Sequence, residues 1–419
     1  MQTSPRLKLF RKRLLILLAV VGPGIITANV DNDAGGITTY SVAGASYGYS
    51  LLWMLVLVTV ALVMVQEMSA RLGVVTGRGL ADLIRESMGV RVTAFVIGVL
   101  LIANLANTVS EFAGVAASME IFGVSKYVSV PIVAIGVWLL IVKGNYRSVE
   151  RIFLVASALY LAYIASGLLV NPPWGQVLRA AVTPSFRFEA GYVTMFITVI
   201  GTTIAPWMQF YQQSAIADKG LKPTDIAYER IDVIVGSLFT DVVAAFIIIA
   251  CAATIFAKGL QIETAQDAAM ALGPLAGAFA EQLFALGLLN ASIFSAAILP
   301  LSTAYVVCEA FGWESGVSRT WKEAPIFFTT YTAIIVIGAG IILLPIKSLI
   351  EAMLQSQTLN GVLLPVILIA MLKLINDRRI MGNYVNGRVF NVLAWATVAV
   401  LITLTGILVI TSFFPTLLG

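Results

Sequence analysis

Two carboxylates, an amide and two adjacent glycines stand together in the stretch DNDAGG, residues 31–36. Carboxylate and amide oxygens are the kind of ligand that hard cations prefer. The stretch lies between the apolar run 14–21 and the milder run 37–47, inside a segment otherwise suited to a membrane-spanning helix. Charge at bilayer depth costs a few kcal/mol, and paired glycines weaken a helix. We therefore interpret DNDAGG as a functional break in a spanning helix.

The composition is that of a membrane protein. Of 419 residues, 59% are hydrophobic and only 11% are charged, with a mean hydropathy of +0.94. Soluble domains carry about 25% charged residues, so there is no room here for a sizeable soluble domain. The pI near 9.0 reflects an excess of only +4, which has a topological explanation and does not indicate nucleic-acid binding.

Cysteine and histidine usage excludes several kinds of site. The two cysteines, Cys251 and Cys308, fall in predicted spans and imply no disulfide framework. The chain has no histidine, which excludes imidazole ligands and the usual side chain for proton relay. The basic and apolar start imitates a signal peptide, but no small-x-small cleavage site follows it, so we expect it to belong to the first span.

The apolar runs predict an all-α polytopic fold with eleven transmembrane helices, since about 20 residues are needed to span a bilayer. The spans are expected near 13–48 (broken), 50–72, 91–119, 126–143, 149–170, 190–215 (broken), 229–257, 277–310, 324–345, 349–373 and 389–415. The stretch 171–188 is expected to be an outer loop, and 262–272 a short outer helix.

The distribution of positive charge supports this count. With the N-terminus in the cytoplasm, all but five of the 26 lysines and arginines fall on the cytoplasmic side, as the positive-inside rule requires. The five on the outer side are Lys126, Arg179, Arg187, Lys258 and Lys347. We therefore expect a protein of the inner (plasma) membrane, surrounded by lipid, with its C-terminus outside.

The sixth span contains a second break. Pro206 has no backbone N–H, so the carbonyl four residues earlier, that of Thr202, is left free for a ligand unless a neighbour satisfies it. Taken by itself, this segment is better explained by an ordinary proline kink, which is common in membrane helices. However, spans one and six are each the first of a set of five. Because five is odd, the second set enters the membrane in the opposite direction to the first. Interrupted helices at matching places of an inverted repeat indicate a midplane site in a transporter.

Three stretches carry a family resemblance. GPGIITANVDNDAGGITTYSVAGA (Gly22–Ala45) resembles the first helix of the Nramp divalent-metal transporters, where a DPGN motif holds the metal. QEMSARLGVVTGRGLADLIRE (Gln66–Glu86) resembles the next helix and loop of that family, and TTIAPW falls at its MPH motif. The resemblance covers most of spans one to ten. It implies a LeuT-type fold in one transporter domain over 1–419, with repeats at about 13–170 and 190–373 and an extra helix at 389–415.

The departures from the family pattern are informative. Aligned without gaps, DPGN becomes Asp33, Ala34, Gly35 and Gly36, and the motif methionine becomes Ala205. Sulfur ligands favour transition metals, so this loss removes that preference. This pattern looks like the Nramp-related magnesium transporters, which carry Mg²⁺ and also Mn²⁺.

The resemblance implies a ligand set made of oxygens. It comprises the Asp33 carboxylate, the Thr202 carbonyl, the amides of Gln357 and Asn360, and water, with Gly36 and Ala205 leaving space for a partly hydrated ion. Asp33 would otherwise cap a half-helix. Asp31 and Asn32 would either line a wider site or cap the other half-helix.

Further polar residues in the spans have open roles. Of the family's helix-three acids only Glu111 remains, since the other positions hold Asn104 and Gly114. Glu111 would attract the cation or pair with a polar neighbour, and Asp241 has no family counterpart. Trp207 would fill the space of a missing histidine or simply pack. Further expectations concern an ion pair between Glu67 and Arg71, and a water-filled vestibule beside the glutamines Gln209, Gln212 and Gln213.

These features predict a monomeric transporter of Mg²⁺, with Mn²⁺ also carried, that works by alternating access without proton coupling and needs no cofactor. Three alternatives stay open: a proton-coupled Mn²⁺ or Fe²⁺ transporter of the Nramp type, an organic-solute symporter of the same fold, and a sensor that binds without transport. A central aspartate would repel the carboxylate of an amino acid, which weighs against the symporter. Nothing in the sequence supports an enzyme, because no nucleophile and base are paired.

Overall fold

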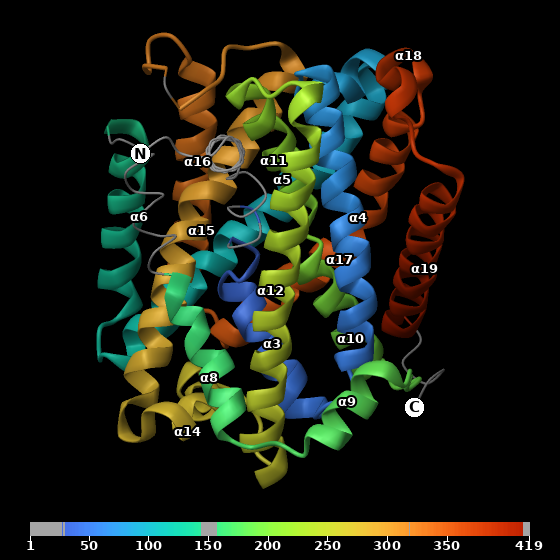
Figure 1. Ribbon diagram of the computed structural model, residues 1–419. Coiled ribbons are helices and arrows are strands. Elements are labelled where there is room, and N and C mark those ends of the chain that lie inside the picture. Colours follow the sequence, from blue (N-terminus) through green and yellow to red (C-terminus); the bar gives the residue numbers. More distant parts are fainter. Residues whose placement is uncertain (1–26, 28–29, 144–156, 318, 414–419) are drawn as a thin grey trace, which may run out of the picture.

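The computed structural model describes residues 27, 30–143, 157–317 and 319–413, and in these ranges every regular element is a helix. The long helices run side by side (Figure 1). In an apolar medium only a helix or a closed barrel satisfies all backbone polar groups, which accounts for this all-helical design. The N-terminal half of the first predicted span and residues 149–156 of the fifth lie outside the described residues.

Nine helical segments in the described ranges are long and apolar enough to cross a membrane, and they match nine predicted spans. They comprise α4 (Leu52–Thr76), α5 (Leu80–Ile121), α6 (Lys126–Lys143), the pair α10 (Ala190–Thr203) and α11 (Pro206–Lys219), α12 (Ile226–Thr254), α15 (Ala280–Phe311), α16 (Pro325–Leu343), α17 (Leu349–Ile375) and α19 (Arg388–Phe413). The other two spans are represented by α3 (Ala34–Tyr47) and α8 (Leu161–Leu169).

Both predicted helix breaks are present. Asn32 and Asp33 form a bend before α3, and Ile204 and Ala205 separate α10 from α11. A third interruption lies at Gly89, whose φ of 79° is outside the helical range and divides α5 near its N-terminal end. This glycine accounts for the difference between the predicted start near 91 and the observed start at Leu80.

The connections are short helices. They comprise α9 (Trp174–Val182), α13 (Ala265–Ala269), α14 (Gly273–Ala276), α18 (Arg378–Met381) and the 3₁₀ turns Ser157–Tyr160, Pro223–Asp225, Phe256–Lys258, Met270–Leu272, Gly277–Phe279 and Gly382–Tyr384. The helix predicted within 262–272 is confirmed as α13, with Thr264 as its cap. The stretch 171–188 is not simply a loop, because α9 forms there and buries Val177.

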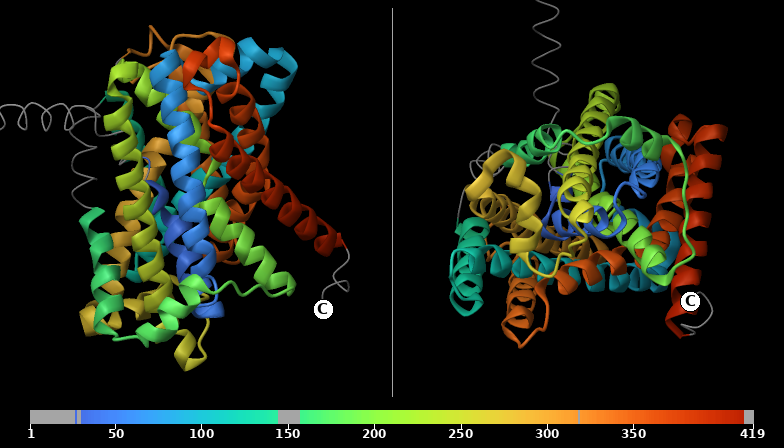
Figure 2. Two further views of the ribbon diagram at one scale, coloured as in Figure 1. Left: turned by 45° about the vertical axis from the view of Figure 1, so that its right-hand side comes forward. Right: turned by 90° about the horizontal axis from the view of Figure 1, so that it is seen from below.

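The two broken helices lie inside the bundle. Figure 2, seen from below, shows α3 enclosed by other helices, and every residue from Ala34 to Ala45 is buried. Ala190–Lys219 is the most buried of the nine candidate spans and the α19 segment the least. The interrupted backbone is therefore surrounded by protein, which is where irregular structure is tolerated at membrane depth.

The two halves of the sixth span pack against different partners. α10 lies on α17 so closely that a Cβ at Gly201 would come within 2.1 Å of the Gln357 carbonyl. The Thr198 and Thr358 hydroxyls also hydrogen bond across this contact, at 2.6 Å. α11 instead lies against α4, where the Ser69 hydroxyl donates to the Gln209 carbonyl at 2.7 Å. The break at Ile204 and Ala205 thus joins two packing groups.

Candidate metal-binding site

Asp33 stands at the start of α3. Its Oδ1 accepts a hydrogen bond of 2.6 Å from the Gly36 backbone N–H, so the side chain caps the helix. The capping role weighed from the sequence is therefore present. An acidic cap also suits the positive end of the helix dipole. The cap employs Oδ1, and a carboxylate oxygen can accept more than one contact, so capping leaves coordination by Asp33 open.

Glu111 of α5 lies against this cap. Its Oε2 accepts from the Ala34 backbone N–H at 3.3 Å, and its carboxyl group interacts electrostatically with that of Asp33. A carboxyl group donates only when it is protonated, so a hydrogen bond within this pair would require a proton on one of the two groups. The structure thus brings together Asp33 and Glu111, two of the acids that the sequence singled out. A cation bound at Asp33 would favour the loss of such a proton.

The first turn of α3 meets the end of α10 at Gly36. A Cβ added to Gly36 would lie 3.4 Å from both Asp33 Oδ1 and Thr202 Oγ1, and 2.5 Å from the Asp31 carbonyl oxygen. The last distance leaves no room for a side chain, so in this conformation the glycine permits close backbone packing. Thr202 Oγ1 is buried and has no hydrogen-bond partner in the described structure, so it is available to a ligand.

The second break supplies backbone oxygens. Pro206 is the first residue of α11 and has no N–H to donate to the Thr202 carbonyl. Ala205 precedes it in an extended conformation, with φ −70° and ψ 140°, and is buried. Its methyl group offers no ligand atom. The donors identified on this side are therefore the Thr202 oxygens.

Two amides of α17 are arranged in series. Gln357 contacts the first turn of α3, where a Cβ at Gly35 would lie 1.9 Å from its Nε2. Its Oε1 accepts from Asn360 Nδ2 at 2.8 Å, and Asn360 also exchanges hydrogen bonds of 3.1 and 2.8 Å with Asn107. Asn360 thus orients the Gln357 side chain through this hydrogen bond. Asn107 was missed by the sequence analysis, although its place four residues before Glu111 on α5 puts both on one helix face.

Asp31 lies on the other side of the break, facing α12. Asn32 Nδ2 donates to Thr240 Oγ1 at 2.7 Å, which brings the break next to this helix. Asp31 is 2% exposed, neither of its oxygens has a hydrogen-bond partner, and it interacts electrostatically with Asp33 and Asp241. An unpaired buried carboxylate is unfavourable, so this position suits a nearby cation.

The polar half-helix α11 does not face a vestibule in this conformation. Gln209, Gln212 and Gln213 are all fully buried, and Gln213 Nε2 donates to the Arg78 carbonyl at 2.9 Å. The prediction of a water-filled vestibule is therefore wrong for this conformation, because Gln213 bonds to the loop after α4 and the helices packed on α11 bury the other two glutamines. The expected ion pair of Glu67 with Arg71 is confirmed at 3.0 Å.

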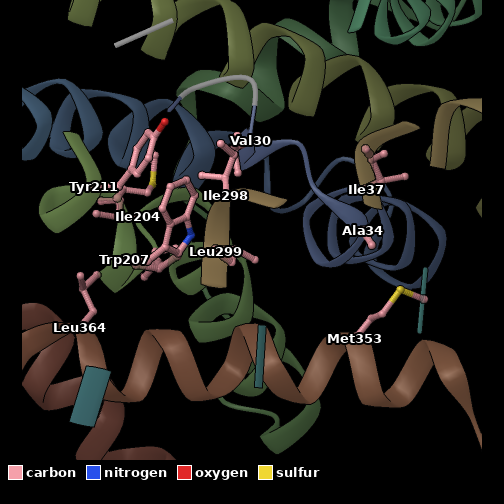
Figure 3. Packing of buried hydrophobic residues seen from close by; sticks show 14 of the residues in the cluster. Val30, Ala34, Ile37, Ile204, Trp207, Tyr211, Ile298, Leu299, Met353 and Leu364 are labelled. Atoms are coloured by element: carbon pink, nitrogen blue, oxygen red, sulfur yellow. The ribbon is translucent and has the colours of Figure 1, made fainter. Parts of the chain in front are cut away.

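Apolar side chains surround both breaks. Figure 3 shows Val30, Ala34 and Ile37 from the first break and Ile204 and Trp207 from the second, and all belong to one buried cluster. The Trp207 ring lies 6.0 Å from that of Tyr211, and its carbonyl accepts from Ser302 at 3.5 Å. Trp207 is therefore a packing residue in this structure. The polar groups described above are surrounded by buried apolar side chains.

A family model described as natural resistance-associated macrophage protein-like, Nramp, matches residues 24–411. The chain belongs to the Nramp family. Among its relatives are the divalent metal cation transporter MntH of Bacillus subtilis, 26% identical over 95% of this chain and 93% of the relative, and the MntH of Ralstonia nicotianae, 29% identical over 95% and 91%.

Solved structures show the same fold. A manganese transporter of Eremococcus coleocola, crystallised with an aromatic bis-isothiourea compound, aligns with a TM-score of 0.78 at 22% identity, over 93% of this chain and 85% of that one. MHP1, a nucleobase-cation-symport-1 family transporter, aligns with a TM-score of 0.59 at 14% identity, over 93% and 91%. The fold is the LeuT-type fold expected from the sequence, and the Nramp relatives named above are transporters, not enzymes.

Proposed function

We propose that this chain carries divalent cations across the membrane, chiefly Mg²⁺ with Mn²⁺ also accepted, by alternating access and without proton coupling. The observation that carries the proposal is the meeting of the two helix breaks at Gly36, beside Asp33 Oδ1 and Thr202 Oγ1. All candidate donors there are oxygens, and Ala205 offers no sulfur. Oxygen donors suit Mg²⁺, whereas a thioether would favour softer metals.

The shortage of carboxylates supports a hydrated ion. Within the described ranges, no group of three or more His, Cys, Asp or Glu side chains could hold a metal ion. Mg²⁺ usually keeps several waters and binds through one or two carboxylates. Asp33 would bind directly, Gln357 would contribute its amide oxygen after releasing Asn360, and Asp31 would act through water or as a further ligand.

The direction of transport follows from the proposed topology. We place the N-terminus in the cytoplasm and the C-terminus outside, in the plasma membrane, because the basic residues then lie mostly inside. A divalent cation that enters without a coupled ion gains about 4.6 kcal/mol per 100 mV of inward potential, twice the value for one charge. Concentration and potential therefore suffice to drive uptake.

One observation favours a second function, proton-coupled Mn²⁺ or Fe²⁺ transport. The carboxyl groups of Asp33 and Glu111 lie beside each other, and a bound cation would displace a proton held by this pair. The relatives are named divalent metal cation and manganese transporters. If the displaced proton travelled with the metal, transport would be coupled. If it returned to the same pair or to the same side, transport would be uncoupled.

The deciding experiment is metal flux into proteoliposomes, with a dye for internal Mg²⁺ and a second dye for pH. Wild type should carry Mg²⁺ without changing the internal pH. Asp33→Ala should lower flux at least about 100-fold, by loss of the charged ligand, an effect of about 2.7 kcal/mol. Glu281→Ala, which removes an exposed acid at the start of α15, is the control and should transport normally. Carriage of Mn²⁺ but not Mg²⁺ would refute the substrate, and metal-dependent acidification would refute uncoupled transport.

A further inference from the structure

A cavity of about 510 Å³ opens at one end of α4, away from the metal site. Its walls come from α4, α12, the turn before α19 and the start of α19 itself. Figures 1 and 2 both show α4 between α12 and the α18–α19 segment. The lining residues are Val63, Met64, Glu67, Arg71, Arg230, Ile234, Asn383, Tyr384, Val385, Gly387 and Phe390. In the topology proposed above, this end faces the cytoplasm.

The charges in the cavity do not balance. Glu67 lies between two arginines, with its oxygens 3.0 Å from Arg71 Nη2 and 2.8 Å from Arg230 Nε. The other partners of Arg71 are neutral, namely the Tyr384 carbonyl at 2.9 Å and Asn386 Oδ1 at 2.5 Å. The lining therefore carries two positive charges and one negative charge. The remaining positive charge calls for an anion.

Arg230 can reach that anion. Its Nε is used for Glu67, but its side chain is 49% exposed, which leaves the terminal nitrogens accessible at the cavity. Arg71 is 7% exposed and fixes Glu67 in place, with its guanidinium 5.6 Å from the Phe390 ring centre. A guanidinium fork binds a phosphate with two parallel hydrogen bonds, so phosphate is the matching chemistry.

The cavity borders the lipid-facing surface of the bundle. Ile234 in the cavity wall is 41% exposed. On α4, Val60 and Val56 lie one and two turns before the lining residue Met64 and are 54% and 50% exposed. On α12, Leu238 continues the same apolar strip at 48%. A phosphate bound at Arg230 would thus lie next to this strip of exposed apolar side chains, which extends toward the membrane interior. A soluble anion has no acyl chain that could contact this strip.

We propose that this cavity binds the headgroup phosphate of an anionic phospholipid from the cytoplasmic leaflet, with an acyl chain along Ile234 and Val60. The assignment of the leaflet rests on the proposed topology, but the binding itself does not depend on transport. The lipid would bridge α4, α12 and the start of α19. It would therefore tie the two helices to the C-terminal span from the membrane side.

The test is native mass spectrometry of the full chain in mixed phosphatidylglycerol and phosphatidylcholine. Wild type should retain phosphatidylglycerol in preference to phosphatidylcholine. Arg230→Gln should lower that retention about fivefold, the effect of one basic residue near an anionic membrane. Arg319→Gln is the matched control, because Arg319 is 50% exposed and paired to Glu314 at 3.2 Å, and it should retain lipid as wild type does.

A steric variant tests the cavity without changing charge. Gly387 lines the cavity, and a Cβ there would meet no atom within 4 Å. The first atom added by Gly387→Leu therefore has room, and the larger side chain would occupy part of the cavity and should also reduce retention. Unchanged retention in Arg230→Gln, or an equal loss in Arg319→Gln, would overturn the proposal. Displacement of phosphatidylglycerol by an equal concentration of inorganic phosphate would show a soluble-anion site and would overturn the lipid assignment. Because the readout is bound lipid, these outcomes are independent of the proposed transport.

Discussion

Gln357 and Gly35 touch across 322 positions of sequence: a Cβ on the glycine would lie 1.9 Å from the amide nitrogen. Gly35 belongs to the first turn of α3, directly after the Asp33 cap. The amide that could enter the metal site is therefore held in register with the helix that begins at Asp33. Any side chain at position 35 would separate them.

Gly35→Ala should destabilise the protein by about 1–3 kcal/mol, the usual cost of overpacking, and should weaken metal binding by displacing Gln357. Thermal unfolding and Mg²⁺ titration measure the two effects. Gly98→Ala, at an α5 glycine whose Cβ would meet nothing within 4 Å, should have no comparable effect. Combining Gly35→Ala with Gln357→Ala should restore stability, and a simple sum of the two losses would contradict the contact.

Ala205→Met should shift selectivity toward Mn²⁺. The thioether adds a soft ligand at the second break, and a gain of about tenfold in Mn²⁺ over Mg²⁺ flux corresponds to about 1.4 kcal/mol. Ala205→Leu is the control for side-chain volume, because leucine is similar in size but has no sulfur. Equal shifts in both variants would mean that volume, not sulfur, determines the preference.

Glu111→Gln should leave Mg²⁺ transport in place. The amide can still accept from Ala34 and donate to Asp33, so the geometry persists, but it cannot release a proton. Metal affinity should fall by no more than about tenfold, as for the mildest changes beside a metal ligand. Glu111→Ala removes both contacts and should cost more, up to about 100-fold. Complete loss of flux in Glu111→Gln with normal folding would favour the coupled mechanism.

Asp241→Asn should raise the melting temperature of the metal-free protein. It should also make the rise in melting temperature caused by Mg²⁺ smaller than in the wild type. The substitution removes a carboxylate that interacts with the unpaired Asp31, so the metal-free state is relieved of repulsion. A ligand at 100 times its Kd stabilises by about 2.7 kcal/mol, and this increment should shrink. Thr240→Ser, which keeps the hydroxyl bonded to Asn32, serves as the control. A full Mg²⁺ effect in Asp241→Asn would exclude Asp241 from the binding region.

Local chemistry made the two breaks predictable. Pro206 has no N–H to offer, and DNDAGG is unfavourable for a continuous helix, so each signal acts within a few residues. The same reasoning identified Thr202, whereas the resemblance to the Nramp family singled out Asp33 and Glu111. The structure groups all three around the start of α3. The length of the apolar runs was enough to place nine spans in the described part of the chain.

Tertiary packing set the features that were not predictable. Gly114 was interpreted as a lost acid, but a Cβ there would come within 2.4 Å of the Ala34 methyl group and 2.3 Å of Ser292 Oγ, so the position admits no side chain. Likewise, the glutamines of α11 are polar enough to suggest water, yet neighbouring helices cover them. Neither fact can be inferred from residue type, because each depends on which helix lies opposite.

The break between α10 and α11 has a mechanical consequence. Asp33 and Thr202 both belong to the group formed by α3, α10 and α17, and a hydrogen bond of 2.8 Å between the hydroxyls of Tyr40 and Thr203 links α3 to α10. α11 belongs with α4. If α11 and α4 swing together about Ile204 and Ala205, the two principal ligands keep their mutual spacing. The group formed by α3, α10 and α17 would move as one unit, and only the wall formed by α11 and α4 would open or close.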